Sequence, residues 1–355
     1  MITKGIFSRT TKRLTQMSRL FSANTFYAKD IEVTLSEDTS KPPLTDKDLI
    51  FCTTPSRHMF EVDFENGEWQ TPRIRPFEDL RISPFNITLH YALTCFEGMK
   101  AYTDDNDQLR LFRPMENMKR FLSSIDRLLL AKFEPEELVK AIEQLVKIDQ
   151  DFVPSKPGSS LYLRPLAFGT ESNLGVKASS STKLMVVTGP VGPYFQTGVE
   201  PIALATYRDY ERGTPKSAAA FKLGSNYGPT CQITGKLMKE QGVSQALWIY
   251  DDKILEVGMS NIFFLLKNKN TGKPELITPP LDGSVLPGIT RKSVIELVEG
   301  EGEVPLTERD FTVTELKQAF EEDRVIEIFG VGTAVTVLPI GELSKFNKIL
   351  TFNSH

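Results

Sequence analysis

The sequence predicts an α/β protein of the α+β kind, built as two domains, and three observations support this fold class. The chain has 355 residues, of which 40% are hydrophobic and 25% charged, so it can bury one large core or two moderate ones; two is expected at this length. Its first half mixes short apolar strands with amphipathic helices, whereas strands dominate the second half. Because strands and helices do not alternate simply, a doubly wound parallel sheet is disfavoured.

Two helices are expected in the first half of the chain. Residues 115–130 carry Met118, Phe121 and Ile125 on one helical face. Residues 134–153 begin with acidic side chains and repeat apolar residues at helical spacing, which predicts a second amphipathic helix. The apolar stripe of this second helix is expected to face the core rather than a cofactor.

Glycine and proline gather in TGPVGPYFQTG (188–198), which indicates the connection between the two domains. The boundaries that follow are residues 30–189 for a small N-terminal domain, 190–200 for the linker and 201–355 for a larger C-terminal domain.

The second domain is predicted to be strand-rich with intervening helices. IALATY, ALWIY, ILEV and NIFFLL are apolar enough for strands, and TCQITGKLMKEQG is expected to be a helix between the first two. Thr312 and Glu315 form a capping box, which predicts a helix over residues 314–323.

The first 29 residues differ from the rest of the chain. No acidic residue precedes Asp30, whereas six residues are basic, and serine and threonine are frequent. This composition is typical of an amphipathic mitochondrial presequence over residues 1–29, with processing expected near Phe21 or Ser22. The alternative is a basic tail on a cytosolic enzyme. Initiation at Met17 would delete most of the signal and leave a cytosolic form.

Composition argues against several function classes. A net charge of −4 lacks the basic excess that a nucleic-acid partner favours, and no apolar stretch approaches the roughly 18 to 20 residues of a membrane helix, so neither partner is expected. Three widely spaced cysteines, Cys52, Cys95 and Cys231, indicate reduced thiols rather than a disulfide framework or a zinc site. With only three histidines, no metal centre is expected, and proton transfer falls to another group such as a lysine.

One lysine and one carboxylate stand among glycines and small polar residues. Lys222 lies in AAAFKLGSNYGPT (218–230), and Glu256 lies in ILEVGMSNIFF (254–264). A lysine whose pKa is lowered by burial or by a cationic neighbour can form a Schiff base with a carbonyl. A carboxylate facing a pyridine nitrogen keeps that ring protonated, as pyridoxal phosphate enzymes require. An isolated pair of this kind is more often a surface lysine and a strand-edge glutamate, so the surrounding motifs decide.

Two turns could bind a phosphate group. LPGITRKS (286–293) places a Pro-Gly turn before a helical pattern, so the amides of Ile289 and Thr290 are expected phosphate ligands. FGVGTA (329–334) is a second turn, in which Thr333 offers both a hydroxyl and an amide.

Seven motifs occur in one order along the chain. They are FEGMKAY (96–102), LRLFRPMENMKR (109–120), LYLRP (161–165), KLGSNYGPT (222–230), LEVGMSNIF (255–263), LPGITRKS (286–293) and FGVGTA (329–334). Together they resemble the branched-chain amino acid aminotransferases of pyridoxal phosphate fold type IV, from about Phe51 to Pro339. The resemblance implies a small α/β domain, a larger domain with a β-barrel-like core, pyridoxal 5′-phosphate as cofactor, and a homodimer. Leucine, isoleucine or valine would give its amino group to 2-oxoglutarate.

The resemblance also implies roles for single residues. Lys222 would be catalytic, holding the cofactor and moving the substrate's α-proton. The implied cofactor-binding residues are Arg120, Arg212, Lys222, Tyr227, Glu256, Ile289, Thr290 and Thr333. The implied substrate-binding residues are Phe51, Tyr91, Phe96, Tyr162, Arg164, Met259, Thr333, Ala334, Leu174 and Val176. Leu174 and Val176 correspond to a loop that enters the neighbouring subunit's site.

Two departures from the family pattern leave alternatives open. Met259 stands where the family usually has a small hydroxyl residue near the cofactor ring, and the sequence ends in SKFNKILTFNSH, before the amphipathic final helix usual in the family. One alternative is a fold type IV aminotransferase with an altered substrate, such as a specialised metabolite or a D-amino acid. The other is a catalytically impaired homologue, against which the joint presence of Lys222, Tyr227 and Glu256 argues.

Overall fold

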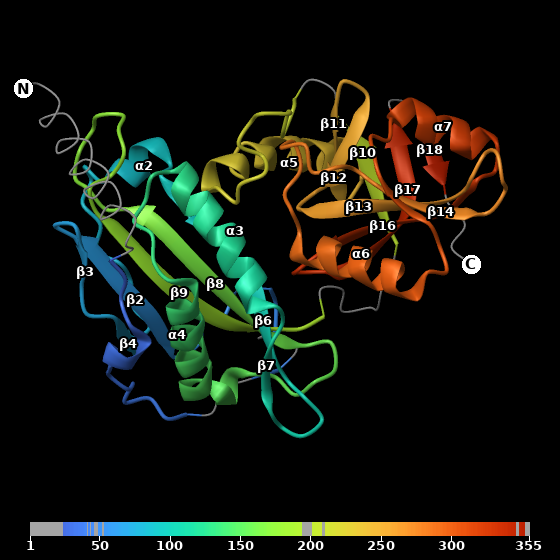
Figure 1. Cartoon of the computed structure of the whole chain (residues 1–355). Helices are drawn as coiled ribbons and strands as arrows, with labels where there is room; N and C mark the ends of the chain where they lie inside the picture. Colours follow the sequence, from blue (N-terminus) through green and yellow to red (C-terminus); the bar gives the residue numbers. More distant parts are fainter. Residues whose placement is uncertain are drawn as a thin grey trace, which may run out of the picture.

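The protein consists of two β-sheets that lie side by side, each with its own helices (Figure 1). The structure is a computed structural model and describes residues 24–40, 42, 44–45, 49–51, 53–193, 201–207, 210–345 and 348–351. Strands between residues 32 and 191 form the first sheet, and strands between residues 202 and 351 form the second.

In the described part of the chain, the first sheet has nine strands in the order β1-β4-β2-β9-β8-β6-β7, with β3 paired to β2 and β5 to β8. Their bounds are β1 Glu32–Val33, β2 His58–Glu65, β3 Glu68–Trp69, β4 Arg73–Pro76, β5 Thr94–Phe96, β6 Met99–Thr103, β7 Leu109–Leu111, β8 Ser160–Gly169 and β9 Thr182–Val191. Three helices accompany it, namely α2 Ile87–Tyr91, α3 Pro114–Arg127 and α4 Pro135–Ile148. Figure 1 shows α3 and α4 along one face of this sheet.

The helix α3 buries the apolar face that the sequence predicts. Met118, Phe121 and Ile125 are fully buried and belong to the same core cluster as Phe60 of β2. Pro114 occupies the start of the helix, where its missing N–H leaves no helical hydrogen bond unmade.

The helix α4 ends earlier than the expected helix over 134–153. It stops at Ile148, and the next residue, Asp149, is fully buried. The Asp149 carboxylate accepts a hydrogen bond from the N–H of His58 at 2.8 Å and lies 2.6 Å from Nδ1 of the same residue, on β2. Because this side chain binds the sheet, the chain leaves the helix here and continues as the short 3-10 turn Gln150–Phe152.

The second sheet closes into a barrel. Since β12 pairs with both β11 and β13, the strands β12-β11-β10-β17-β16-β13 form a closed ring of six, and β14 and β15 extend it beyond β13. The bounds are β10 Ile202–Thr206, β11 Gln245–Tyr250, β12 Lys253–Val257, β13 Ser260–Lys267, β14 Pro274–Thr278, β15 Leu306–Glu308, β16 Val325–Gly332, β17 Thr336–Lys345 and β18 Lys348–Thr351. Its helices are α5 Thr230–Gln241, α6 Ile289–Glu301 and α7 Val313–Glu321. The predicted fold class, with a barrel-like core in the second half, is therefore confirmed.

One half of the predicted capping box is found at the start of α7, since the Glu315 carboxylate accepts from Arg309 instead. The hydroxyl of Thr312 accepts a hydrogen bond from the N–H of Glu315 at 2.9 Å. Immediately before it, Phe311 packs against Phe264 of β13, with 4.4 Å between the ring centroids. The cap and this aromatic contact fix where the helix begins.

The glycine- and proline-rich segment expected to connect the domains starts inside a strand. β9 continues to Val191, which pairs with Ser160 of β8. Gly189 is required in this strand, because a Cβ there would lie 2.4 Å from the carbonyl oxygen of Thr54. Residues 194–200 lie outside the described residues.

Residues 24–29, which the sequence assigns to the presequence, pack against the first sheet. Phe26 is buried, and its ring lies 5.5 Å from that of Trp69 and 5.9 Å from that of Phe133. A leader that is removed without opening this core therefore has to end before Phe26. The greater part of the expected presequence, residues 1–23, lies outside the described residues.

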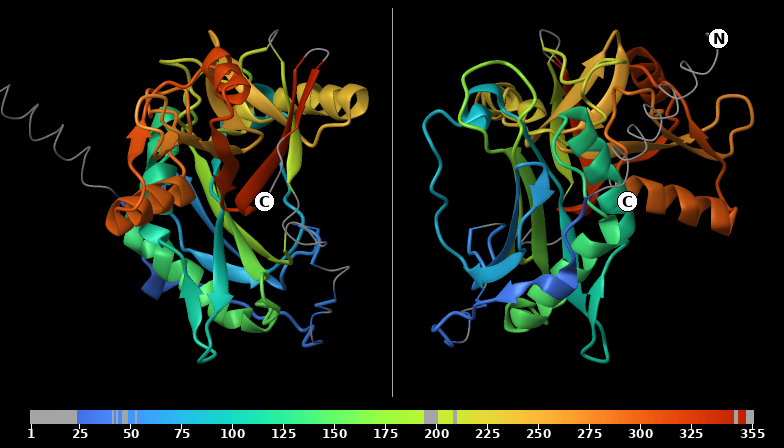
Figure 2. Two further views of the ribbon diagram at one scale, coloured as in Figure 1. Left: turned by 90° about the vertical axis from the view of Figure 1, so that its right-hand side faces the viewer. Right: turned by 60° about the vertical axis from the view of Figure 1, so that its left-hand side comes forward.

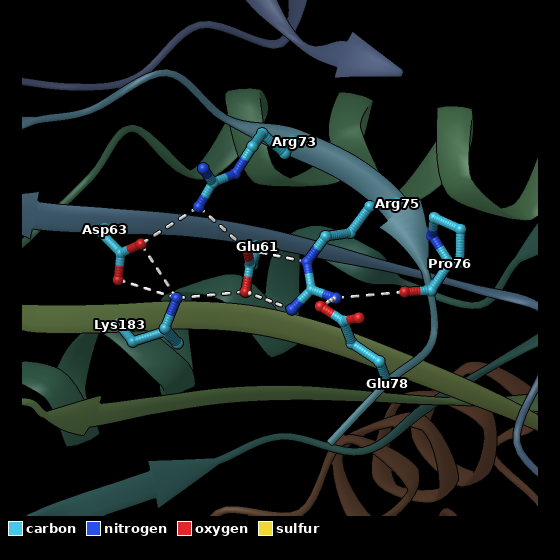
Figure 3. Close-up of polar contacts among 7 residues, drawn as sticks. All are labelled: Glu61, Asp63, Arg73, Arg75, Pro76, Glu78 and Lys183. Carbon is cyan, nitrogen blue, oxygen red and sulfur yellow. Dashed lines mark hydrogen bonds and ion pairs between the residues drawn. The ribbon is translucent and has the colours of Figure 1, made fainter. Parts of the chain in front are cut away.

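A cluster of charged side chains joins three strands on the face of the first sheet that lies opposite α3 and α4 (Figure 3). Glu61 of β2 is buried and accepts hydrogen bonds from Arg73 and Arg75 of β4 and from Lys183 of β9, at distances of 2.9 to 3.1 Å. Burial alone would raise the pKa of Glu61, but Arg75 and Lys183 lower it to about 2. Three strands are thus joined by one carboxylate that stays ionised.

Within the described ranges, no helix is long and apolar enough to cross a membrane. No group of three histidine, cysteine, aspartate or glutamate side chains in these ranges is arranged to hold a metal ion. Cys95 is a buried free thiol and Cys231 an exposed one.

Candidate active site

A cavity of about 310 Å³ lies between the two sheets and is lined by both. The lining residues are Phe51, Phe96, Gly98, Arg120, Tyr162, Arg164, Lys222, Tyr227, Glu256, Met259, Asn261, Leu286, Gly288, Ile289, Thr290, Val331, Gly332, Thr333 and Ala334. Most residues that the sequence singles out therefore lie in one place, although they come from seven separate motifs and, for Phe51, from outside them.

Lys222 is held at the centre of this cavity by its own backbone. Its N–H donates to the hydroxyl of Ser124 on α3 at 2.9 Å, and its carbonyl accepts from the N–H of Phe96 on β5 at 3.0 Å. The Nζ atom donates to the phenol oxygen of Tyr227 at 3.2 Å and lies 4.8 Å from the centre of the Phe96 ring. The segment around Lys222 (218–230) follows β10, the first strand of the second sheet. These hydrogen bonds anchor it to the first sheet and its helix α3.

The surroundings of Lys222 favour its neutral amine. Burial lowers the pKa of Lys222 to about 7, and the positive charge of Arg120 acts in the same direction. Burial likewise raises the pKa of Tyr227 to about 12, so the phenol keeps its proton. The site therefore presents an amine that can act as a nucleophile and base near neutral pH, beside a phenol that can donate a hydrogen bond.

Glu256, on β12, faces the same cavity from the barrel side. Its carboxylate accepts from the N–H of Leu286 at 3.0 Å and from the side-chain amide of Asn261 at 3.2 Å, and it contacts Arg212. Burial raises the pKa of Glu256, and the Arg212 guanidinium opposes this rise. A buried carboxylate of raised pKa is a good partner for a ring nitrogen that shares a proton with it.

The start of α6 also lines the cavity, and the segment before it reaches Glu256 through the N–H of Leu286. No side chain caps this helix at Gly288, and the next two residues, Ile289 and Thr290, line the cavity. A Cβ at Gly288 would lie 1.9 Å from the side-chain oxygen of Asn261, so only glycine fits. The amides of a helix start bind anions, and Thr333 on the second turn lines the same cavity.

Arg120 is held beside the start of α6 by a residue that the sequence analysis did not single out. Glu97 accepts from Nε and Nη2 of Arg120 at 2.7 and 2.8 Å, and Nη1 donates to the carbonyl of Pro287 at 3.0 Å. Arginine has five N–H donors, of which these contacts use three, so two remain for a ligand. Glu97 lies inside the motif FEGMKAY, but a sequence alone shows no partner for it.

The third part of the cavity combines aromatic rings with one arginine. The guanidinium of Arg164 lies 4.7 Å from the centre of the Phe96 ring, and its Nη2 donates to the hydroxyl of Tyr162 at 3.0 Å. The Nε of Arg164 is buried with no hydrogen-bond partner, and the ring of Phe51 lies 5.0 Å from that of Tyr162. Gly98 is required because a Cβ there would lie 2.2 Å from the Tyr162 hydroxyl. An apolar group and an anionic group of one small ligand would both find partners here.

Four of the expected residues do not line the cavity. Arg212 faces Glu256 rather than the start of α6. Tyr91, Leu174 and Val176 lie together elsewhere on the surface, where the Tyr91 hydroxyl contacts the carbonyl of Leu174 and the Val176 side chain is 83% exposed.

The class IV amino-transferase family matches residues 94–343 of this chain. A branched-chain-amino-acid aminotransferase of Dictyostelium discoideum is 46% identical over 303 residues, covering 84% of this chain and 80% of the relative. The mitochondrial branched-chain-amino-acid aminotransferase of Rattus norvegicus is 41% identical over 342 residues, covering 95% and 86%. The cytosolic enzyme of that name from Mus musculus is 42% identical over 332 residues, covering 92% and 85%.

Solved structures share the fold. The branched-chain aminotransferase from Thermoproteus uzoniensis with norvaline superposes with a TM-score of 0.64 at 25% identity, covering 79% of this chain and 86% of that one. The branched-chain amino acid aminotransferase from Thermobaculum terrenum, in its pyridoxal phosphate form, gives a TM-score of 0.64 at 20% identity, covering 82% and 87%.

Proposed function

Because the chain belongs to the class IV aminotransferases, and within them to the branched-chain-amino-acid aminotransferases, we propose that it transfers the amino group of leucine, isoleucine or valine to 2-oxoglutarate, with pyridoxal 5′-phosphate as cofactor. One observation carries the proposal. The amine of Lys222, whose pKa is lowered to about 7, shares one cavity with the buried carboxylate of Glu256 and with the uncapped start of α6.

The residues present fit this cofactor. Its phosphate would be held by the amides of Ile289 and Thr290, by Thr333 and by the two free N–H groups of Arg120. Glu256 would face the ring nitrogen, and the phenol of Tyr227 would donate to the ring's oxygen. Glycine at position 288 leaves open the space where a side chain would collide with Asn261.

Pyridoxal phosphate, when bound, supplies an aldehyde that joins to amines and a ring that takes up electrons from the substrate's α-carbon. Lys222 would hold the cofactor and then, as a free amine, accept and return the α-proton, since a base is most effective when its pKa lies near the working pH. Tyr227 holds the Lys222 amine in place through the 3.2 Å hydrogen bond. Glu256 would keep the ring nitrogen protonated, and a protonated ring would favour loss of the substrate's α-proton.

Substrate recognition divides between polar and apolar groups. Arg164, with its unpartnered Nε, and the amides of Thr333 and Ala334 would bind the carboxylate of the amino acid. The rings of Phe51, Phe96 and Tyr162, together with Met259, would enclose its aliphatic side chain. A single methylene changes binding in such a pocket by only about 1 to 3 kcal/mol, so all three branched-chain substrates should be accepted.

We further propose a homodimer in which Leu174 and Val176 of one copy complete the site of the other. Both side chains, with Tyr91, are exposed and apolar, as expected of a surface that a second copy covers. Sedimentation of the purified protein tests this, and a monomer with full activity would contradict it.

The proposed compartment is the mitochondrion, because residues 1–29 carry six basic residues and no acidic one. A fluorescent protein fused after residue 29 should enter mitochondria. A diffuse cytosolic signal would instead favour the basic tail or initiation at Met17.

Borohydride reduction tests the proposed role of Lys222. Reduction of the purified holoenzyme should fix pyridoxal phosphate to this lysine, and a peptide mass should identify the modified residue. Modification of another lysine, or none, would overturn the assignment. Formation of glutamate from leucine and 2-oxoglutarate by the untreated enzyme tests the reaction itself.

A further inference from the structure

The two helices that flank the phosphate end of the cavity are joined by charged side chains. α3 carries Arg120, and α6 begins at the cavity, so each helix supplies one part of the anion-binding end. Between them, Nη1 of Arg113 lies 2.5 Å from Oε2 of Glu296, and Nζ of Lys292 lies 2.8 Å from Oε2 of Glu116.

These contacts repeat once per helical turn and in opposite directions. Arg113, at the N-cap of α3, meets Glu296 of α6, and Glu116 of α3 meets Lys292 of α6. Arg120 of α3 then meets the carbonyl of Pro287, two residues before α6 begins. The steps of three and four residues from Arg113 to Arg120, and of four from Glu296 to Lys292, keep these side chains on one helical face. Residue numbers rise along α3 as they fall along α6, so the two helices run antiparallel, and Figure 2 shows α6 next to α3. We call these three contacts the α3–α6 ladder.

Charged side chains join these helices, whereas their apolar side chains belong to two different core clusters. The buried apolar residues of α3 belong to the core of the first sheet, whereas Val294, Ile295 and Val298 of α6 pack with the barrel. A groove of about 530 Å³ runs between the helices, and ladder residues line it. The ladder therefore spans two separate cores.

We propose that the α3–α6 ladder is a positioning device that fixes the distance between Arg120 and the amides at the start of α6, and so determines how tightly the cofactor's phosphate is held. The proposal rests on the proposed function, because that phosphate is the anion concerned. The side chains of Glu116 and Lys292 are 25% and 48% exposed. Pairs this exposed contribute little to the stability of a fold, so the effect should appear in phosphate binding rather than in unfolding.

The chain offers a matched control for this test. Both Lys292 and Lys119 donate to Glu116, at 2.8 and 3.0 Å, but Lys119 lies on the same helix as Glu116 and joins nothing to α6. Lys292→Gln and Lys119→Gln therefore remove the same charge and the same donor, and only the first breaks the ladder.

The experiment titrates cofactor-free, full-length protein with pyridoxal phosphate and, separately, with pyridoxal, which lacks the phosphate. Lys292→Gln should weaken pyridoxal phosphate binding roughly fivefold, and Lys119→Gln less than about twofold, while pyridoxal binding stays within about twofold in both. Glu116→Lys should weaken pyridoxal phosphate binding about tenfold, and adding Lys292→Glu should restore it to within about threefold. Thermal unfolding of each variant checks that the fold is kept.

If Lys292→Gln and Lys119→Gln lost equal affinity for pyridoxal phosphate, charge alone would matter, and the ladder proposal would be overturned. A failure of the exchanged pair to restore binding would do the same. If the unaltered protein bound neither pyridoxal phosphate nor pyridoxal, the proposed function would fail, and the ladder proposal with it. If every variant bound pyridoxal phosphate and pyridoxal with the same ratio of affinities as the unaltered protein, the ladder proposal would be rejected and the proposed function would stand.

Discussion

Two buried carboxylates flank the lysine, and their environments have opposite effects. Glu97 meets Arg120 on the side of the first sheet, and Glu256 meets Arg212 on the side of the barrel. Burial would raise the pKa of Glu97, but Arg120 holds it below its usual range. At Glu256 burial prevails over the Arg212 contact, and the pKa is raised.

Glu97 accepts four hydrogen bonds, whereas Glu256 meets three partners and also faces the cavity. Besides two contacts from Arg120, Glu97 accepts from the side-chain amide of Asn117 at 2.9 Å and the N–H of Gly98 at 3.1 Å, and it does not line the cavity. Glu256 lines the cavity and can still meet a ligand. Glu97 is therefore placed to support the architecture, and Glu256 is placed to take the chemical role that we propose for it.

The largest effect is expected at Lys222, which lies between these two carboxylates. Lys222→Ala should reduce the transamination rate by at least about a thousandfold while the protein still folds, because only the covalent and proton-transfer roles are lost. Steady-state rates with leucine, together with thermal unfolding, measure both effects. More than trace activity in the folded variant would remove Lys222 from the mechanism.

The two carboxylates can be compared directly by the same change. Glu256→Gln should keep the fold and lower kcat about a hundredfold, since an amide cannot hold a ring proton as a carboxylate does. Glu97→Gln should instead destabilise the protein by about 3 to 5 kcal/mol, because Arg120 is left as a buried charge without its partner.

Denaturant unfolding and kcat, measured on both variants, decide this comparison. The account requires that the larger loss of stability belongs to Glu97→Gln and the larger loss of kcat, among folded molecules, to Glu256→Gln. The reverse pattern would show that the two carboxylates have been assigned to the wrong roles.

A smaller effect is expected in how the reaction rate of the Lys222 amine depends on pH. Only the neutral amine attacks an aldehyde, so the rate at which cofactor-free protein captures pyridoxal should rise about tenfold per pH unit and level off near pH 7. An unperturbed lysine would give a rate that keeps rising to about pH 10. Stopped-flow absorbance distinguishes these profiles, and a rise continuing past about pH 9 would contradict the lowered pKa.

The smallest expected effect is at Met259, which lines the cavity from the barrel side and is 67% exposed. If its volume narrows the substrate pocket, Met259→Thr should raise kcat/KM for isoleucine or leucine about tenfold. Kinetics with each branched-chain amino acid measure this. An unchanged or reduced kcat/KM would show that the pocket has adapted to methionine, and that the preferred substrate lies outside these three.

The sequence was most informative where chemistry dictates residue type. The periodic apolar residues of α3 and the Thr312 cap led to correct helix positions, and the motif glycines marked turns that the cavity requires. The residues missed are those that act through a distant partner. Glu97 binds Arg120, 23 positions away, and Asn261 binds both Glu256 and the carbonyl of Leu286. Glu97 and Arg120 meet within the first domain, and Asn261 lies opposite Glu256 on the adjacent strand, so both pairings depend on tertiary structure.

The ends of helices and of the expected presequence were predicted less well, because they too depend on contacts between residues far apart in the sequence. α4 ends where Asp149 binds His58, a contact across 91 residues that helical periodicity cannot reveal. Likewise, Phe26 belongs to a core assembled from three distant aromatic residues, although its neighbours in sequence have the composition of a leader. Local composition does not record such long-range packing.

The absorption spectrum of the purified protein, recorded before and after addition of leucine, shows whether the protein carries pyridoxal phosphate on Lys222 and takes the amino group from leucine. The account predicts a visible band from pyridoxal phosphate linked to Lys222, which disappears as leucine is converted to its 2-oxo acid in equimolar amount and returns when 2-oxoglutarate is added. A protein without this band, or with a band that leucine leaves unchanged, would contradict the proposed transaminase.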